Sequence, residues 1–192
     1  DIFLNNVKKI SGILNGTTNY ILTTMENQNK SFNEVLDDAK ERGFTSDNES
    51  KLDIGGYDAA HKLTLLSTIS FGGNIDFNLN QIEGIEKITI EDINFVKHLG
   101  FRIKLISECF LIDNMIYSST QPKLIPLDKP LANVDGALNA INIETDQLEN
   151  LYLEGEGAGG IATASSILSD IFEISNNSHY RSIGYKINDL KN

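Results

Sequence analysis

Apolar and polar positions follow two different periods along this chain, and the two periods predict a mixture of strands and helices. Alternation of period two predicts strands, whereas apolar positions three and four residues apart predict helices. The predicted strands are 7–14, 85–88, 102–112, 115–121, 140–143 and 151–153. The predicted helices are 20–25, 32–42, 57–70, 91–99 and 162–174. Because the two kinds of element do not alternate strictly, we predict an α+β fold with one open, mixed but mostly antiparallel sheet and helices packed on one face.

Short polar signals mark where several helices begin. Ser31 and Glu34 have the spacing of a capping box, and Thr89 stands where it can cap the helix that follows. Asn15 or Thr17 can cap the first helix, at the turn that follows the first strand. The N–H groups at the start of that helix are then available to an anion or a carbonyl oxygen.

One stretch combines charge with predicted burial. The acid-rich loop 43–56 runs into the helix 57–70, whose apolar residues cover most of its circumference and predict a central helix. Asp58 and Lys62 lie one turn apart on one face of this helix, and Asp53 lies just before it. The structural interpretation is an ordinary salt bridge. The functional one is a lysine that carboxylates keep protonated, so that it exchanges a proton with a substrate oxygen.

Composition and charge exclude several classes of protein. The chain has 192 residues, 40% of them hydrophobic, which suits one domain or slightly more. A net charge of −11 and a pI of about 4.6 argue against nucleic acid and against an anionic membrane surface as partners. No run reaches the roughly 18 apolar residues of a membrane span, and the start is unlike a signal peptide. The single cysteine, Cys109, lies in an apolar run and is expected to be a buried thiol, which suits the reducing cytoplasm.

Other groups give weaker signals. His98 and His179 lack cysteine or acidic partners at ligand spacing, so no zinc site is expected, and the acidic loop lacks the alternating ligands of a calcium site. The glycine-rich run Gly155–Gly160 satisfies the loose dinucleotide-binding pattern, but no βαβ unit surrounds it. This run is therefore either a structural turn between a strand and a helix or the lining of a ligand site.

Four blocks of the sequence resemble homoserine dehydrogenases. They read GILNGTTNYIL at 12–22, GGYDAAHKL at 55–63, PLANVDGALNA at 130–140 and GEGAGGIATA at 155–164. The resemblance covers about residues 7–174 in the family's order, and its first two blocks are highly specific. It implies a cytoplasmic, homodimeric, NAD(P)-dependent oxidoreductase that interconverts L-aspartate 4-semialdehyde and L-homoserine, on the route to threonine, methionine and isoleucine.

The resemblance also implies a role for each matching residue. Lys62 corresponds to the catalytic lysine, which protonates the aldehyde oxygen as hydride arrives, and Asp58 orients this lysine or the substrate. Asp53 corresponds to a residue that binds the substrate's amino group. Gly16 and Thr17 correspond to residues that line the pocket between substrate and nicotinamide.

Two departures from the family pattern affect the acidic loop. Phe44 stands where the family usually has tyrosine, so a phenolic contact to substrate is lost from this substrate-binding position. The loop is one residue longer than the usual Gly-Tyr-x-Glu-x-Asp-Pro run, whose glutamate holds the substrate's ammonium. Asp47 and Glu49 compete for that role, and counting back from Asp53 favours Asp47.

The resemblance extends only to the substrate-binding and catalytic domain, expected at 1–174, with a tail at 175–192. Since the family's N-terminal NAD(P)-binding Rossmann domain is not in this sequence, we expect a partial chain whose helix 162–174 packs on that domain. Thr17, Gly157 and Gly159 are the candidates here for contact with NAD(P), with no sign of a preference for NAD or NADP. The alternatives are the substrate domain of another two-domain NAD(P)-dependent oxidoreductase, or a stand-alone amino-acid-binding or dimerisation module.

Overall fold

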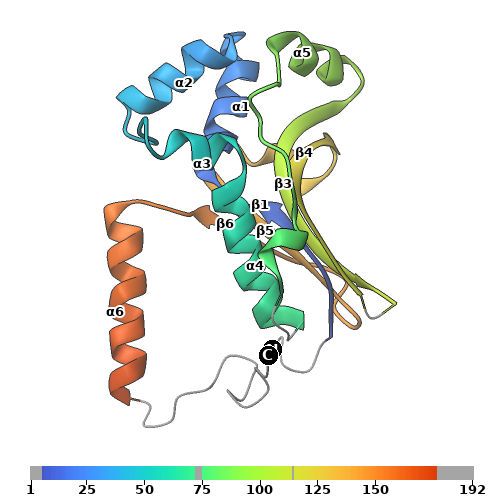
Figure 1. The fold of residues 1–192 in the computed structure, drawn as a ribbon, viewed down its shortest axis with the longest axis vertical. Helices are drawn as coiled ribbons and strands as arrows, with labels where there is room; N and C mark the ends of the chain where they lie inside the picture. Colours follow the sequence, from blue (N-terminus) through green and yellow to red (C-terminus); the bar gives the residue numbers. More distant parts are fainter. Residues whose placement is uncertain (1–5, 72–74, 114, 177–192) are drawn as a thin grey trace.

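The structure, a computed structural model, describes residues 6–71, 75–113 and 115–176, and its centre is a six-stranded sheet (Figure 1). In chain order the strands are β1 (Val7–Ile13), β2 (Gln81–Ile82), β3 (Phe101–Ile112), β4 (Met115–Pro126), β5 (Leu138–Thr145) and β6 (Leu151–Glu156). They lie in the order β2-β4-β3-β1-β5-β6. All neighbours pair antiparallel except β2 with β4, which confirms the predicted mixed, mostly antiparallel sheet.

The helices gather on one side of this sheet, apart from the last one. They are α1 (Gly16–Gln28), α2 (Phe32–Glu41), α3 (Ser50–Ile54), α4 (Tyr57–Phe71), α5 (Ile90–His98) and α6 (Gly160–Asn176), with short 3₁₀ turns η2 (Phe77–Leu79) and η3 (Pro130–Asn133). Figure 1 shows α1, α2 and α5 grouped at one end, α4 running along the sheet and α6 standing apart. The α+β class predicted from the sequence is therefore confirmed.

Local hydrogen bonds confirm the predicted helix starts. Of the two candidates for the first cap, Asn15 is the one that acts, because its Oδ1 accepts the N–H of Thr18 at 2.8 Å. Glu34 accepts the N–H of Ser31 at 2.9 Å, and the side chain of Thr89 caps α5. These contacts satisfy N–H groups that the helices themselves leave without partners.

The main core lies between the sheet and α1, α2, α4 and α5. Ile21, Val35, Leu63 and Cys109 are completely buried in it. Fully burying one such aliphatic side chain stabilises the fold by about 1.5–3 kcal/mol. The buried cysteine expected from the sequence is confirmed, and its burial raises the pKa of the Cys109 thiol.

Two sequence predictions about the region after residue 56 are wrong. Residues 85–88 form a turn rather than a strand, closed by the N–H of Ile88 donating to the carbonyl of Ile85 at 3.0 Å. The side chain of Ile85 enters the core from this turn, so its apolar character reflects burial without sheet pairing. The helix α4 is not central: one side packs on the core while Leu65 and Ile69 are 66% and 54% exposed.

The strand β4 is longer than predicted, because it continues through Pro122 to Pro126. A proline lacks the N–H that a central strand needs, so prolines occur where a strand has no partner on one side. That condition holds here, since β2 pairs with β4 only at Ser119 and Thr120.

The last helix, α6, is the most exposed element that the structure describes. None of its residues is buried, and Ile161 and Phe172 are 90% and 71% exposed. Neither α6 nor any other helix in the described ranges combines the length and apolarity needed to cross a membrane.

Candidate functional site

A cavity of about 860 Å³ opens where segments distant in the sequence meet. Its wall is formed by the start of α1, the loop between α2 and α4 with the first turns of α4, and two loops at the ends of β5 and β6. The lining residues are Asn15, Gly16, Thr17, Arg42, Gly43, Phe44, Glu49, Leu52, Asp53, Asp58, Lys62, Ala137, Leu138, Asn139, Glu156, Gly157, Ala158 and Gly159. All the candidate site residues predicted from the sequence line this cavity except Asp47.

Lys62 projects from α4 into the cavity with its ammonium group held by two acceptors. Its Nζ donates to Asp58 Oδ2 at 2.7 Å, across one helical turn, and to the carbonyl oxygen of Leu14 at 3.1 Å. An ammonium group carries three N–H bonds, so one remains for an oxygen atom of a ligand. The carbonyl contact fixes the lysine against the end of β1, which a simple surface salt bridge does not do.

Asn15 joins the two carboxylates that flank this lysine. Its Nδ2 donates to Asp53 Oδ1 at 2.8 Å and to Asp58 Oδ2 at 2.9 Å, while its Oδ1 caps α1. Thr45 donates to the other oxygen of Asp53 at 2.7 Å. Sequence reasoning treated Asn15 only as a helix cap and missed this bridging role; the available signal was its place in the first of the four blocks.

Gly16 and Thr17 bring the start of α1 against two other walls of the cavity. A Cβ atom added to Gly16 would lie 2.5 Å from the carbonyl oxygen of Ala137, so only glycine fits there. The hydroxyl of Thr17 donates to the carbonyl oxygen of Phe44 at 2.9 Å. The ring of Phe44 packs against that of Tyr20, with 4.5 Å between centroids, and still reaches the cavity.

The structure separates Asp47 from Glu49, which the sequence left in competition. Asp47 is 89% exposed and pairs with Lys40 at 2.7 Å, and this hydrogen bond lowers the pKa of its carboxyl group. Glu49 lines the cavity instead. The preference for Asp47 therefore has no support in the geometry. The chain turns at these residues, since the N–H groups of Glu49 and Ser50 both bond back to the carbonyl of Ser46.

The cavity carries more negative than positive charge. Glu49, Asp53, Asp58 and Glu156 line it, against the two cations of Arg42 and Lys62. Such an excess favours a ligand that carries a positive group. Among the described residues, no group of three or more histidine, cysteine or acidic side chains is arranged to hold a metal ion.

The glycine-rich loop forms part of the same cavity. Gly157 packs so closely on Asn139 that an added Cβ would lie 2.0 Å from the asparagine Nδ2. Gly159 has φ of +121°, a backbone conformation that favours glycine. This wall of the cavity is therefore formed by backbone that packs closely on the side chain of Asn139.

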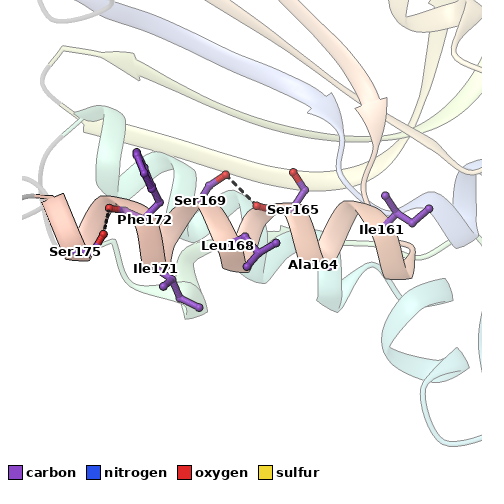
Figure 2. A pocket seen from close by; sticks show the side chains of 8 residues that line it. All are labelled: Ile161, Ala164, Ser165, Leu168, Ser169, Ile171, Phe172 and Ser175. Atoms are coloured by element: carbon purple, nitrogen blue, oxygen red, sulfur yellow. Dashed lines mark hydrogen bonds between the residues drawn. The ribbon is translucent and has the colours of Figure 1, made fainter.

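A second hollow of about 860 Å³ has a different character. It is lined only by residues of α6, among them Ile161, Leu168 and Phe172, which Figure 2 shows projecting from one helix. No ionisable side chain lines it. It is one apolar helix face rather than an enclosed site. Its lining also lacks the ionisable groups that proton transfer requires.

The fold and the cavity together define a class: an α+β domain in which a lysine and carboxylates meet beside a glycine-rich wall. A sequence model of homoserine dehydrogenase matches residues 2–172. The chain belongs to the homoserine dehydrogenase family.

Individual relatives agree with the family match. The homoserine dehydrogenase of Neisseria gonorrhoeae is 38% identical over 170 residues, which are 88% of this chain and 39% of that protein. The crystal structure of a homoserine dehydrogenase from Thiobacillus denitrificans superposes with a TM-score of 0.88 at 36% identity, over 95% of this chain and 43% of that one. A hyperthermophilic archaeal homoserine dehydrogenase mutant in complex with NADPH gives a TM-score of 0.75 at 28% identity, over 94% and 51%. The chain thus spans about two fifths to one half of these relatives.

Proposed function

We propose that this chain is the substrate-binding and catalytic domain of an NAD(P)-dependent homoserine dehydrogenase. The reaction is the interconversion of L-aspartate 4-semialdehyde and L-homoserine, a step toward threonine, methionine and isoleucine, in the cytoplasm. The observation that carries the proposal is the ammonium of Lys62, held by Asp58 and the Leu14 carbonyl with its third N–H available in the cavity.

Lys62 acts on the substrate oxygen. When the aldehyde is reduced, its carbon gains a hydride and its oxygen gains the proton that Lys62 donates; in the reverse direction Lys62 accepts the hydroxyl proton. The ammonium also stabilises negative charge that develops on this oxygen. Asp58 and the carbonyl of Leu14 hold Nζ in place, so the lysine does not have to be ordered when the substrate binds.

The acidic part of the cavity binds the substrate's ammonium group. Asp53 is fixed by Asn15 and Thr45, one at each carboxylate oxygen, and each oxygen retains lone pairs for a further donor. Of the two acidic residues that the sequence leaves as candidates for this contact, Glu49 is assigned the role because it lines the cavity and Asp47 does not. Phe44 supplies an apolar contact to the substrate and no hydroxyl group.

The residues around the glycine-rich wall fit a nicotinamide cofactor. Thr17, Gly157 and Gly159 line the cavity that contains Lys62, and glycine at 157 lets this wall pack directly on Asn139. The chemistry that a bound NAD(P) supplies is transfer of the hydride. A relative is known in complex with NADPH, which supports this assignment. Most of the cofactor's contacts belong to an N-terminal Rossmann domain, and the exposed apolar face of α6 packs on that domain.

The molecule is a homodimer that associates through the sheet. The support for this part of the proposal is the exposed apolar character of the long strands: Leu111, Tyr117 and Leu124 are all exposed. Sedimentation of the full-length protein tests it, and a monomer at micromolar concentration would contradict it.

Turnover of homoserine by the full-length protein tests the reaction, followed by absorbance of the reduced nicotinamide. Lys62→Met should lower kcat/KM by about a thousandfold. Lys129→Met is the matched control, since the Lys129 side chain is exposed and lies outside the cavity. Activity of Lys62→Met within tenfold of wild type would refute the role of Lys62. Activity on other hydroxy acids only would indicate another oxidoreductase, and homoserine binding without turnover would indicate a binding module.

A further inference from the structure

A buried lysine, Lys104 on β3, lies outside the cavity and has no part in the reaction described above. It is only 2% exposed, and lysines are almost never fully buried without partners. Its Nζ donates to the carbonyl oxygen of Val134 at 2.6 Å, to Asn19 Oδ1 at 3.0 Å and to Thr23 Oγ1 at 3.4 Å. Its three N–H bonds therefore match three acceptors, which come from α1 and from the segment after η3.

The contact with Lys104 fixes the orientation of Asn19. Because Asn19 Oδ1 accepts from the lysine, the amide nitrogen points the other way. Its Nδ2 donates to the carbonyl oxygens of Val134 at 3.0 Å and Leu138 at 3.2 Å. Lys104 and Asn19 thus hold both ends of the segment 134–138.

This segment carries one wall of the cavity. Ala137, Leu138 and Asn139 line it, and the carbonyl of Ala137 lies against Gly16 at the start of α1. Asn139 in turn contacts Gly157 of the glycine-rich wall. A shift of 134–138 would therefore move the surface that faces Gly16 and Thr17.

The charged groups around Lys104 belong to a connected set. Asp135, on the held segment, lies 3.7 Å from Nζ and also accepts from Arg102 at 2.8 Å. Arg102 pairs with Glu26 of α1 at 2.9 Å and donates to the carbonyl of Ala132. Burial lowers the pKa of Lys104 to about 8, with Arg102 acting in the same direction and Asp135 and Glu26 opposing it. The lysine is still mostly protonated at neutral pH, so all three N–H bonds are present.

We propose that Lys104 is a positioning residue for the active site: through Val134 and Asn19 it fixes the segment 134–138 and so the wall formed by Ala137–Asn139. The expected change in KM rests on the proposed function, whereas the expected loosening of the segment 134–138 does not. A wall that contacts ground state and transition state alike changes KM more than kcat. A residue that only stabilised the fold would change the amount of active protein, and hence apparent kcat, without changing KM.

The test uses Lys104→Met in the full-length protein, with Lys129→Met as the matched control. We expect KM for homoserine to rise about tenfold with kcat within about threefold of wild type. Hydrogen exchange followed by mass spectrometry should show about tenfold faster exchange in 134–139, with exchange in α2 and α5 unchanged. Lys129→Met should match wild type in both measurements.

An unchanged KM, or unchanged exchange in 134–139, would overturn the proposal. If Lys104→Met does not fold, Asn19→Asp replaces it, because this variant keeps the acceptor for Lys104 and removes both N–H donors to the segment. The same rise in KM and in exchange is expected, and their absence overturns the proposal equally. If wild-type protein does not turn over homoserine, the proposed function fails and the exchange measurement alone decides the role of Lys104.

Discussion

Removing the side chain of Asn15 should destabilise the protein and disorder the site together. In Asn15→Ala the cap of α1 is lost, which costs about 1 kcal/mol. The N–H bonds to Asp53 and Asp58 are also lost. A hydrogen bond to a charged group contributes about 1.5–3 kcal/mol, but these carboxylates border a cavity that water can enter, so about 1 kcal/mol each is the better figure. The free energy of unfolding should fall by about 3 kcal/mol.

Two further substitutions separate the stability contributed by the helix cap from that contributed by the hydrogen bonds to Asp53 and Asp58. Asn15→Ser keeps a capping oxygen and removes the amide donors, so it should destabilise by about 2 kcal/mol. Asn15→Asp keeps the cap but places a third carboxylate beside Asp53 and Asp58. Like charges at this distance favour protonation of one group, so the loss of stability in this variant should shrink as the pH falls toward 5.

Urea denaturation followed by circular dichroism measures these differences. For a chain of this size, 3 kcal/mol corresponds to a fall in Tm of about 9 °C. Asn78→Ala is the control, because the exposed amide of Asn78 bonds only within its own turn, to Asp76, and its loss should change stability by less than about 0.5 kcal/mol. If Asn15→Ala unfolds at the same urea concentration as Asn78→Ala, the bridge does not stabilise the site as argued.

Three other outcomes are expected. Glu49→Gln should raise KM for homoserine about tenfold in a steady-state assay, whereas Asp47→Asn should change it less than twofold; equal effects would contradict the assignment. Gly157→Ala should weaken homoserine and cofactor binding by calorimetry, because its Cβ would meet Asn139 at 2.0 Å, and unaltered affinities would show that the wall yields. The pKa of Lys104 is about 8 when folded and 10.5 when free, so unfolded chains bind more protons between these values. Between pH 8 and 10.5 the free energy of unfolding of wild type should therefore rise by up to about 3 kcal/mol relative to that of Lys104→Met, as measured by urea titration. A difference between the two proteins that does not change with pH would contradict a lysine whose pKa is lowered by burial.

Contacts between residues a few positions apart were predictable from the sequence, whereas contacts between elements distant in the chain were not. The pairing of Asp58 with Lys62 follows from helical spacing, and the caps at Ser31 and Thr89 follow from side chains three residues apart. The second role of Asn15 depends on Asp53, which is brought to it only by the packing of α3 and α4 against the start of α1. No periodicity along the chain encodes that contact.

The errors have the same origin. The strand predicted at 85–88 is a turn from which Ile85 is buried, because an apolar side chain can reach a core from any backbone conformation. The choice between Asp47 and Glu49 stays a prediction: it came from counting residues, which says nothing of the turn at Ser46 that precedes the short helix α3. The apolar circumference of α4 predicted burial on all sides, whereas Leu65 lies on an exposed side.

The pairing of β1 has a consequence for how the protein folds during synthesis. In the finished sheet Ile10 lies between Cys109 of β3 and Ile143 of β5. On the ribosome, β1 must therefore wait for β3 to emerge before one of its edges can pair, and for β5 before the other can. Pairings of such high contact order form slowly, and an exposed apolar strand is prone to aggregate meanwhile. The cavity, whose walls come from both sides of this strand, is accordingly assembled late.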